Sequence, residues 1–203
     1  LDGKAGVEVG AEIAWDKAQE AKIPCAFFVN KCDDPESDFE RTFEQLRDTF
    51  GRNVCPTFVP VKSGADMLFV NLIYMKIYSF DSKGSRTEHP MTDDIKAQVE
   101  KYIEPLKEAI AMTSDELLEK YLNGEEISLN EMVLALHEGL IVGSIVPVFS
   151  GAAVKLWGIK GLMDTIADSF PRHTAKKEEK AEDADAIAID PDGACAVFIF
   201  KTL

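Results

Sequence analysis

Two short apolar runs constrain the fold of this chain more than any other feature. Ala26-Phe27-Phe28-Val29 and Ile145-Val146-Pro147-Val148-Phe149 are apolar at every position, so each predicted strand is apolar on both faces. Strands of this kind belong to parallel sheets that helices cover on both sides. Amphipathic helical spacing flanks the first run, at residues 7–22 and 38–50, and a further helical pattern follows the second run until Pro171. This alternation of helical patterns and buried strands predicts an α/β, doubly wound domain.

The middle of the chain has a different character. Residues 57–61 and 68–73 predict short strands, and residues 81–90 predict a polar loop. Two capping-box spacings, Thr113-x-x-Glu116 and Ser128-x-x-Glu131, each predict the start of a helix. The middle is therefore expected to form an α+β unit within the α/β domain.

A longer helix is predicted to begin at Thr92, with apolar residues recurring along one face as far as Ile110. Pro105 lies inside this segment and is expected to kink or split the helix near Ile103. Residues 88–138 contain 13 acidic and 4 basic residues, a local balance of −9. Three of the acidic residues project to the side opposite the apolar face: Glu100, Glu104 and Glu108. Such an excess is also what ordinary solvated helix faces carry.

Composition argues against several classes of protein. The net charge of −14 does not suit a broad basic face that grips nucleic acid. The sequence has no run of about 18 apolar residues, so no membrane span is predicted, and its first residues do not resemble a signal peptide. The four cysteines form no CxxC pair and no metal-ligand spacing with histidine. A reduced, cytoplasmic setting without structural zinc is therefore expected.

The first apolar run ends in the tetrad Asn30-Lys31-Cys32-Asp33. Guanine presents two adjacent donors, N1–H and the 2-amino group, and a single carboxylate such as Asp33 can accept from both. The Asn30 amide can bridge the base edge and a neighbouring loop, and the Lys31 stem can lie along the purine face. Ligands of open α/β sheets bind at the carboxyl ends of strands, where this tetrad falls. Four polar residues after a strand also occur by chance, so the tetrad alone does not decide the function.

Small residues follow the second apolar run in a comparable position. Gly151, Ala152 and Ala153 leave backbone N–H groups open to close approach by a base carbonyl such as the 6-oxygen of guanine. The same pattern is typical of an ordinary strand-to-helix turn. Two such loops after two buried strands strengthen the interpretation of each as part of a guanine site.

Over essentially its whole length the chain resembles the translational GTPase elongation factor G. The residues that carry the resemblance occur in the family's order: Gly6-Val7-Glu8-Val9, Phe28-Val29-Asn30-Lys31-Cys32-Asp33, Met75-Lys76-Ile77-Tyr78, the run from Asp115 to Glu126, Ile145-Val146-Pro147-Val148-Phe149, and Phe200-Lys201-Thr202. The fold class that this resemblance implies is the C-terminal half of a doubly wound P-loop GTPase domain with an inserted α+β subdomain.

The resemblance also accounts for the 117 residues that separate Asp33 from Gly151. Elongation factor G carries an inserted subdomain at this place. The implied organisation is part of the GTPase domain at 1–51, the acidic insert at 52–144, the last strand and helix of the GTPase domain at 145–171, a linker at 172–187, and the start of a β-barrel domain at 188–203.

The resemblance assigns roles to individual residues. Asn30, Lys31 and Asp33 are expected to recognise the guanine base, and Ala153 to donate its backbone N–H to the 6-oxygen, with Val154 against the ring. Gly151 and Ala152 complete this nucleotide-binding loop. The sequence departs from the family at Cys32, where most members have Met, and at Ala152, where most have Ser, so Ala152 lacks a hydroxyl that braces the loop.

The phosphate half of a GTPase site has no counterpart in the sequence. No G-x-x-x-x-G-K-[ST] loop and no Asp-x-x-Gly segment placed to hold magnesium is present. The expected cofactors, GTP or GDP with Mg²⁺, therefore belong to an intact protein. This piece alone is expected neither to hydrolyse GTP nor to bind it tightly.

The partners that the resemblance implies are the ribosome and, through the acidic insert, the lysine-bearing ribosomal stalk protein. Glu100, Glu104 and Glu108 are the candidate partner-binding residues. The parent activity is expected to be GTP-driven translocation on the ribosome. A tetracycline-protection or release-factor GTPase shares the tetrad and stays open as an alternative. An acidic interaction module that binds no nucleotide also stays open as an alternative.

Overall fold

The computed structural model describes residues 1–64, 66–170, 178–179, 186–190 and 193. The chain divides into two units, Leu1–Phe170 and Pro171–Leu203. The elements of the first unit, in chain order, are α1 (Val9–Glu20), β1 (Phe27–Val29), α2 (Phe39–Phe50), β2 (Val54–Pro56), β3 (Phe58–Ser63), β4 (Asp66–Asn71), β5 (Lys76–Phe80), β6 (Arg86–His89), α3 (Asp93–Ala111), α4 (Asp115–Leu122), α5 (Leu129–Val142), β7 (Val146–Ser150), a 3₁₀ turn (Ala153–Lys155) and α6 (Ile159–Ser169).

The first sheet is parallel and has the strand order β1-β7-β2. Neighbouring residues of β1 alternate between its two faces. Phe27 stacks on Trp15 of α1 and on Phe50 of α2, with ring centroids 5.7 and 5.0 Å away. Phe28 packs on the other side, in a cluster that includes Phe149. The predicted parallel sheet with both faces covered is confirmed.

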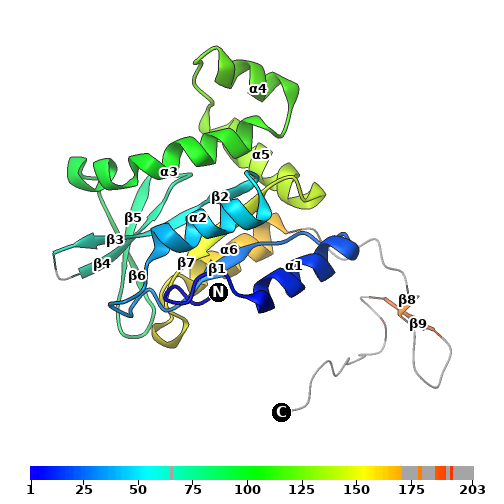
Figure 1. Ribbon diagram of the computed structural model, residues 1–203, viewed down its shortest axis with the longest axis horizontal. Coiled ribbons are helices and arrows are strands. Elements are labelled where there is room, and N and C mark those ends of the chain that lie inside the picture. Colours follow the sequence, from blue (N-terminus) through cyan, green and yellow to red (C-terminus); the bar gives the residue numbers. More distant parts are fainter. Residues whose placement is uncertain (65, 171–177, 180–185, 191–192, 194–203) are drawn as a thin grey trace. The chain divides into compact units, whose positions relative to one another are not determined.

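The second sheet is an antiparallel meander of β3, β4, β5 and β6 (Figure 1). Aromatic rings of this sheet pack against one another. Phe58 stacks on Phe69, with ring centroids 5.6 Å apart, and Phe80 lies edge-on to Phe69, with ring centroids 5.4 Å apart. The two sheets are joined where Thr57 Oγ1 donates to the Val148 carbonyl at 3.0 Å and Ser150 Oγ donates to the Phe58 carbonyl at 2.7 Å. Buried hydroxyls thus satisfy carbonyls at the junction between the sheets.

Helix α3 lies over β2 and β3, across the junction of the two sheets (Figure 1). The predicted split of the helix at Pro105 is wrong, because α3 continues unbroken through this residue, and the kink offered as the alternative stays a prediction. Proline removes one helical hydrogen bond there, but buried side chains hold the helix on both sides of it. Those anchors are Ile95, Val99, Tyr102, Leu106 and Ile110.

Of the two predicted capping boxes, one is present and the other is absent. Ser128 and Glu131 form the predicted capping box at the start of α5. Helix α4 instead begins after Ser114, whose hydroxyl accepts from the Leu117 amide, so the capping box predicted at Thr113 is wrong. Thr113 Oγ1 donates to the Ile110 carbonyl at 2.7 Å, a bond that closes the end of α3.

The predicted polar loop at 81–90 is also wrong in part, because Arg86–His89 forms strand β6. This strand is polar, so it shows no apolar alternation, and its backbone bonds to β5 define it. Strand β2 pairs with β7 in the parallel sheet although it lies inside the range 52–144 assigned to the insert. The strand pairing therefore joins Val54–Pro56 to the parallel sheet, and the insert as a separate subdomain stays a prediction.

The second unit contains β8 (Glu178–Glu179) and β9 (Ile187–Ala188), which pair antiparallel. Most of the predicted linker at 172–187 and of the predicted barrel start at 188–203 lies outside the described residues, as does the whole strand predicted at 194–200. Among the helices that the structure describes, none has the length and apolar composition that crossing a bilayer requires.

Candidate functional site

Two loops meet at the carboxyl edge of the parallel sheet, one after β1 and one after β7. The strands are direct neighbours, with Val29 opposite Ser150. Cys32 N donates to the Gly151 carbonyl at 2.9 Å, and Gly151 N donates to the Val29 carbonyl at 3.0 Å. Backbone bonds therefore fix the start of one loop against the start of the other.

The predicted base-reading side chains lie in this junction. The Ala153 backbone N–H donates to Asn30 Oδ1 at 2.9 Å, so the amide of Asn30 bridges the two loops as its position predicted. Asp33 lies opposite Lys155, with 3.4 Å between the ammonium nitrogen and Oδ2. The Asp33 side chain is 27% exposed, so its carboxylate is within reach of a ligand. The structure thus brings Asn30, Asp33 and Ala153 together from positions over 100 residues apart.

The loop after β7 has a closed shape that depends on its small residues. Ala152 and Trp157 exchange backbone hydrogen bonds of 3.1 and 3.0 Å. A Cβ at Gly151 would lie 2.1 Å from the Trp157 carbonyl oxygen, so only glycine fits there. The Ala152 side chain is buried, whereas Val154 is 96% exposed and therefore free to contact a base.

Lys155 was not predicted as a site residue, but it is the closest cation to Asp33 that the described residues provide. Its ammonium also lies 4.6 Å from the ring centroid of Trp157, within cation–π distance. The Trp157 ring in turn packs edge-on against Phe69, 6.2 Å away. The head of Lys155 is therefore held between a carboxylate and an indole.

Lys31 leaves the strand in the left-handed backbone region, with φ of +63°. Its ammonium pairs with Asp2 Oδ2 at 2.6 Å. The hydrogen bond from Lys31 lowers the pKa of Asp2, and the hydrogen bond to Asp2 raises the pKa of Lys31. No sequence signal indicated Asp2, because 29 residues separate it from Lys31 and an isolated backbone bridge between Asp2 and Asn30 brings them together.

Cys32, the residue that departs from the family's usual Met, faces the core rather than the ligand side. It is 3% exposed and packs in the same cluster as Phe58 and Phe149. Burial raises the pKa of its thiol to about 12. The side chain can therefore vary between Cys and Met without contact with a base.

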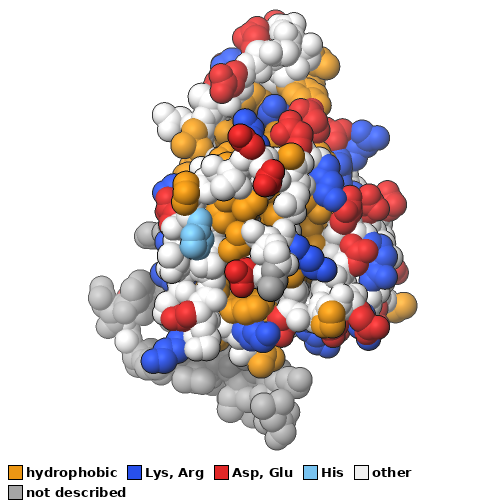
Figure 2. Space-filling model, turned by 90° about the vertical axis from the view of Figure 1, so that its left-hand side faces the viewer, with side chains coloured by type: hydrophobic (Ala, Val, Ile, Leu, Met, Phe, Trp, Pro, Cys, Tyr) orange, Lys and Arg blue, Asp and Glu red, His pale blue; other side chains and the backbone are white. Residues whose placement is uncertain are grey.

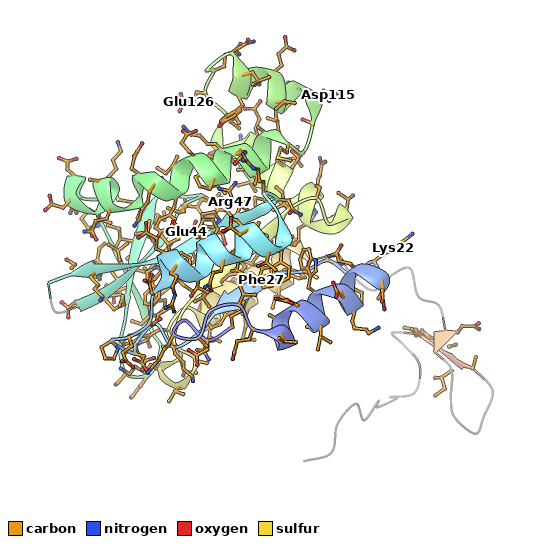
Figure 3. The ribbon with its side chains drawn as sticks, viewed as in Figure 1. Lys22, Phe27, Glu44, Arg47, Asp115 and Glu126 are labelled. Carbon is orange, nitrogen blue, oxygen red and sulfur yellow. The ribbon has the colours of Figure 1, made fainter. Side chains whose placement is uncertain are left out.

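The acidic stripe predicted on α3 is only partly a free surface. Glu100 and Glu104 are exposed, but Glu108 is only 24% exposed and pairs with two arginines. Its two carboxylate oxygens lie 2.5 Å from Arg47 and 2.7 Å from Arg52. Figure 3 shows Arg47 on α2, facing α3. The inclusion of Glu108 in an outward stripe is therefore wrong, because its carboxylate joins α3 to α2.

Charges of both signs are mixed over the surface that faces the viewer in Figure 2. Among the described residues, no group of three or more His, Cys, Asp or Glu side chains is placed to hold a metal ion. At the two loops, Asp33 is already paired with Lys155, and one paired carboxylate is not a donor set that fits Mg²⁺. The described residues at the two loops therefore do not fit the magnesium of a GTPase.

The fold defines an α/β domain in which two loops meet at the carboxyl edge of the parallel sheet, the edge where open α/β sheets bind ligands. Residues 1–172 match the Elongation factor Tu GTP binding domain. Since this match covers most of the chain, the chain belongs to that family and is part of a GTP-binding domain of the translational GTPase type.

A solved structure supports the same placement. The chain is similar to the crystal structure of ttk003000868 from Thermus thermophilus, with 28% sequence identity and a TM-score of 0.75. The match covers 86% of this chain and 26% of that chain, so this sequence spans about a quarter of the length of that relative.

Proposed function

We propose that this chain is the base-reading part of a translational GTPase of the elongation factor G type. The observation that carries the proposal is the junction of the two loops: the Ala153 N–H donates to the Asn30 amide at 2.9 Å, and a partly exposed Asp33 lies beside it. These groups are the acceptor and donor that the edge of guanine requires, at the carboxyl end of adjacent parallel strands.

The recognition follows from the donors and acceptors present. Asp33 accepts from N1–H and the 2-amino group together, a charge-assisted bidentate pair that adenine cannot make. The Ala153 N–H donates to the 6-oxygen, which requires the Asn30 amide to release it and turn toward the base edge. Val154, exposed at the mouth of the loop, packs against the ring. Lys155 shares the Asp33 carboxylate with the base.

An exchange of bases tests this assignment. Asp33→Asn presents one donor and one acceptor, which suits xanthine, whose 2-oxygen replaces the amino group of guanine. We expect this variant to lose about 10- to 100-fold in affinity for GMP and to gain affinity for XMP. Amide shifts of Gly151 and Ala153 in ¹H–¹⁵N spectra of the chain report the binding, which is expected to be about millimolar without the phosphate half of a site.

Asp34→Asn is the matched control, because it removes the same charge one residue away. Asp34 accepts from the Glu36 amide, and an asparagine oxygen can still do so. Its GMP affinity is expected to stay at the wild-type value. Equal binding of GMP, XMP and AMP by the unmodified chain would refute the assignment.

For the whole protein we propose GTP-driven translocation on the ribosome in the cytoplasm, with Mg²⁺ and the phosphates held by residues outside this sequence. The ribosomal stalk protein is the proposed partner of α3, now through Glu100 and Glu104 alone. Glu100→Lys with Glu104→Lys is expected to weaken binding to a basic stalk domain and to remove its dependence on salt. Glu125→Lys with Glu126→Lys, in the loop between α4 and α5, is the charge-matched control, and equal loss in both pairs would dismiss α3 as the contact.

A further inference from the structure

Asp2 is anchored to the end of the strand from which the base-reading tetrad starts. Its backbone forms a parallel bridge with Asn30. Gly3 N donates to the Asn30 carbonyl at 2.9 Å, and Gly6 N donates to the Asp2 carbonyl at 2.8 Å. The backbone position of Asp2 is therefore tied to that of Asn30.

Both oxygens of the Asp2 carboxylate accept hydrogen bonds. Oδ1 accepts from the Lys4 amide at 2.9 Å, closing a local turn, and Oδ2 accepts from the Lys31 ammonium at 2.6 Å. The two oxygens thus have separate partners, one local and one across the loops. The Asp2 side chain is 28% exposed, against 57% for Lys31, so the more exposed lysine is held by the less exposed aspartate.

Lys31 is held at its other end by its backbone. A left-handed conformation is unfavourable for a residue with a Cβ, so the φ of +63° needs support from its surroundings. Neighbouring backbone bonds supply it, since Asn30 N donates to the Leu1 carbonyl at 2.8 Å and Asp34 N donates to the Lys31 carbonyl at 3.0 Å. Both ends of the Lys31 side chain thus have partners, the bonded backbone at one end and Asp2 at the other.

We propose that Asp2 is a positioning residue of the guanine site, which holds Lys31 extended so that its methylene stem forms one wall of the base pocket. This inference rests on the proposed function. Asp2 itself touches no base and acts through Lys31. A wall that is ordered before binding loses less side-chain entropy when the base arrives, and the gain appears as affinity.

A double-mutant cycle on the whole 203-residue chain tests the inference. Asp2→Asn keeps an oxygen for the Lys4 amide but loses the ion pair, and Lys31→Met keeps an apolar stem but loses the ammonium. We expect Asp2→Asn to weaken GMP binding by about two- to fivefold. In the Lys31→Met background the same substitution should change the affinity by less than about 1.5-fold, because the ammonium that Asp2 holds is gone.

Glu36→Gln is the control for the loss of a negative charge, because Glu36 pairs with Lys4 in the same group of loops and not with Lys31. It should leave GMP binding unchanged. An undiminished effect of Asp2→Asn in the Lys31→Met background, or no effect in either background, would overturn the positioning role. Failure of the unmodified chain to prefer GMP over AMP would instead refute the proposed function, and the two failures are distinguishable.

Discussion

Gly151 occupies the tightest point of the loop after β7. A methyl group there would lie 2.1 Å from the Trp157 carbonyl oxygen and 2.8 Å from Phe28 Cζ. We expect Gly151→Ala to lower the free energy of unfolding by about 1–3 kcal/mol, as overpacking does, and to shift the amide resonances of the loop. Urea denaturation measures the loss. Gly161→Ala, in α6 with open space around the new methyl group, should instead stabilise the chain by about 0.5–1 kcal/mol.

The thiols of the described residues differ in reactivity for a physical reason that can be measured. Burial raises the pKa of Cys32 and of Cys55 to about 12, while Cys25 is only partly buried and its pKa is raised less. Since the thiolate is the reactive species, Cys25 should be alkylated by iodoacetamide at pH 8 well before the other two. Peptide mapping of a time course checks the order, and equal rates in folded protein would contradict the burial of Cys32.

At the scale of elements, an ion pair joins α4 to α5. Lys120 pairs with Glu131, the same residue that completes the capping box at Ser128. The hydrogen bonds from Lys120 and from Ser128 lower the pKa of Glu131 from its usual 4.5 to about 2. A lowered carboxyl pKa stabilises the fold fully above the unfolded value and loses that contribution as the pH falls through the folded value.

The contact between α4 and α5 is therefore expected to weaken between about pH 4.5 and pH 2. A ¹³C titration of the Glu131 carboxyl should give a midpoint near 2, and Lys120→Met should move it toward 4.5. Hydrogen exchange of the first turn of α5 should accelerate over the same interval. A midpoint near 4.5 in the unmodified chain would show that the ion pair does not persist in solution.

The elements also show where sequence patterns succeed and where they stop. Apolar runs and periodicity correctly predicted α2 and two of the three strands of the parallel sheet, β1 and β7, because burial against neighbours produces the pattern itself. It missed β6, whose strand character comes from backbone bonds to β5, and it overestimated Pro105, whose cost the packing of α3 offsets. Propensity acts within a few residues, and these two outcomes depend on contacts between distant segments.

Some contacts of the candidate site could likewise be predicted from the sequence, and others could not. The convergence of Asn30, Asp33 and Ala153 could be predicted, because the carboxyl ends of parallel strands meet at one edge of a sheet. The pairs Asp2–Lys31 and Lys155–Asp33 could not be predicted, since they depend on how side chains turn after the strands end. The role given to Glu108 failed for the related reason that a helix projection does not show which neighbour lies beside it.

At the scale of the whole molecule, Glu108 joins segments that lie far apart in the sequence. It connects α3 to Arg47, which is 61 residues away on α2, and to Arg52, which is 56 residues away just before β2. Arg47 is 19% exposed, and its Nε has no partner among the described residues. Removal of the Glu108 charge would leave this guanidinium poorly compensated between two helices.

Glu108→Gln is therefore expected to lower the free energy of unfolding of the Leu1–Phe170 unit by about 1–3 kcal/mol at pH 7, less than for a fully buried pair. Urea denaturation measures this loss. Glu88→Gln, which breaks the exposed pair with Lys76, is the control and should cost below about 1 kcal/mol.

The hydrogen bond from Arg52 lowers the pKa of Glu108 below its usual 4.5. The deficit of the variant should therefore be constant above that pH and shrink as the pH falls further, when the wild-type carboxylate also becomes protonated. A deficit that does not change with pH would assign the effect to packing, and the two helices would then be held together without the ion pair.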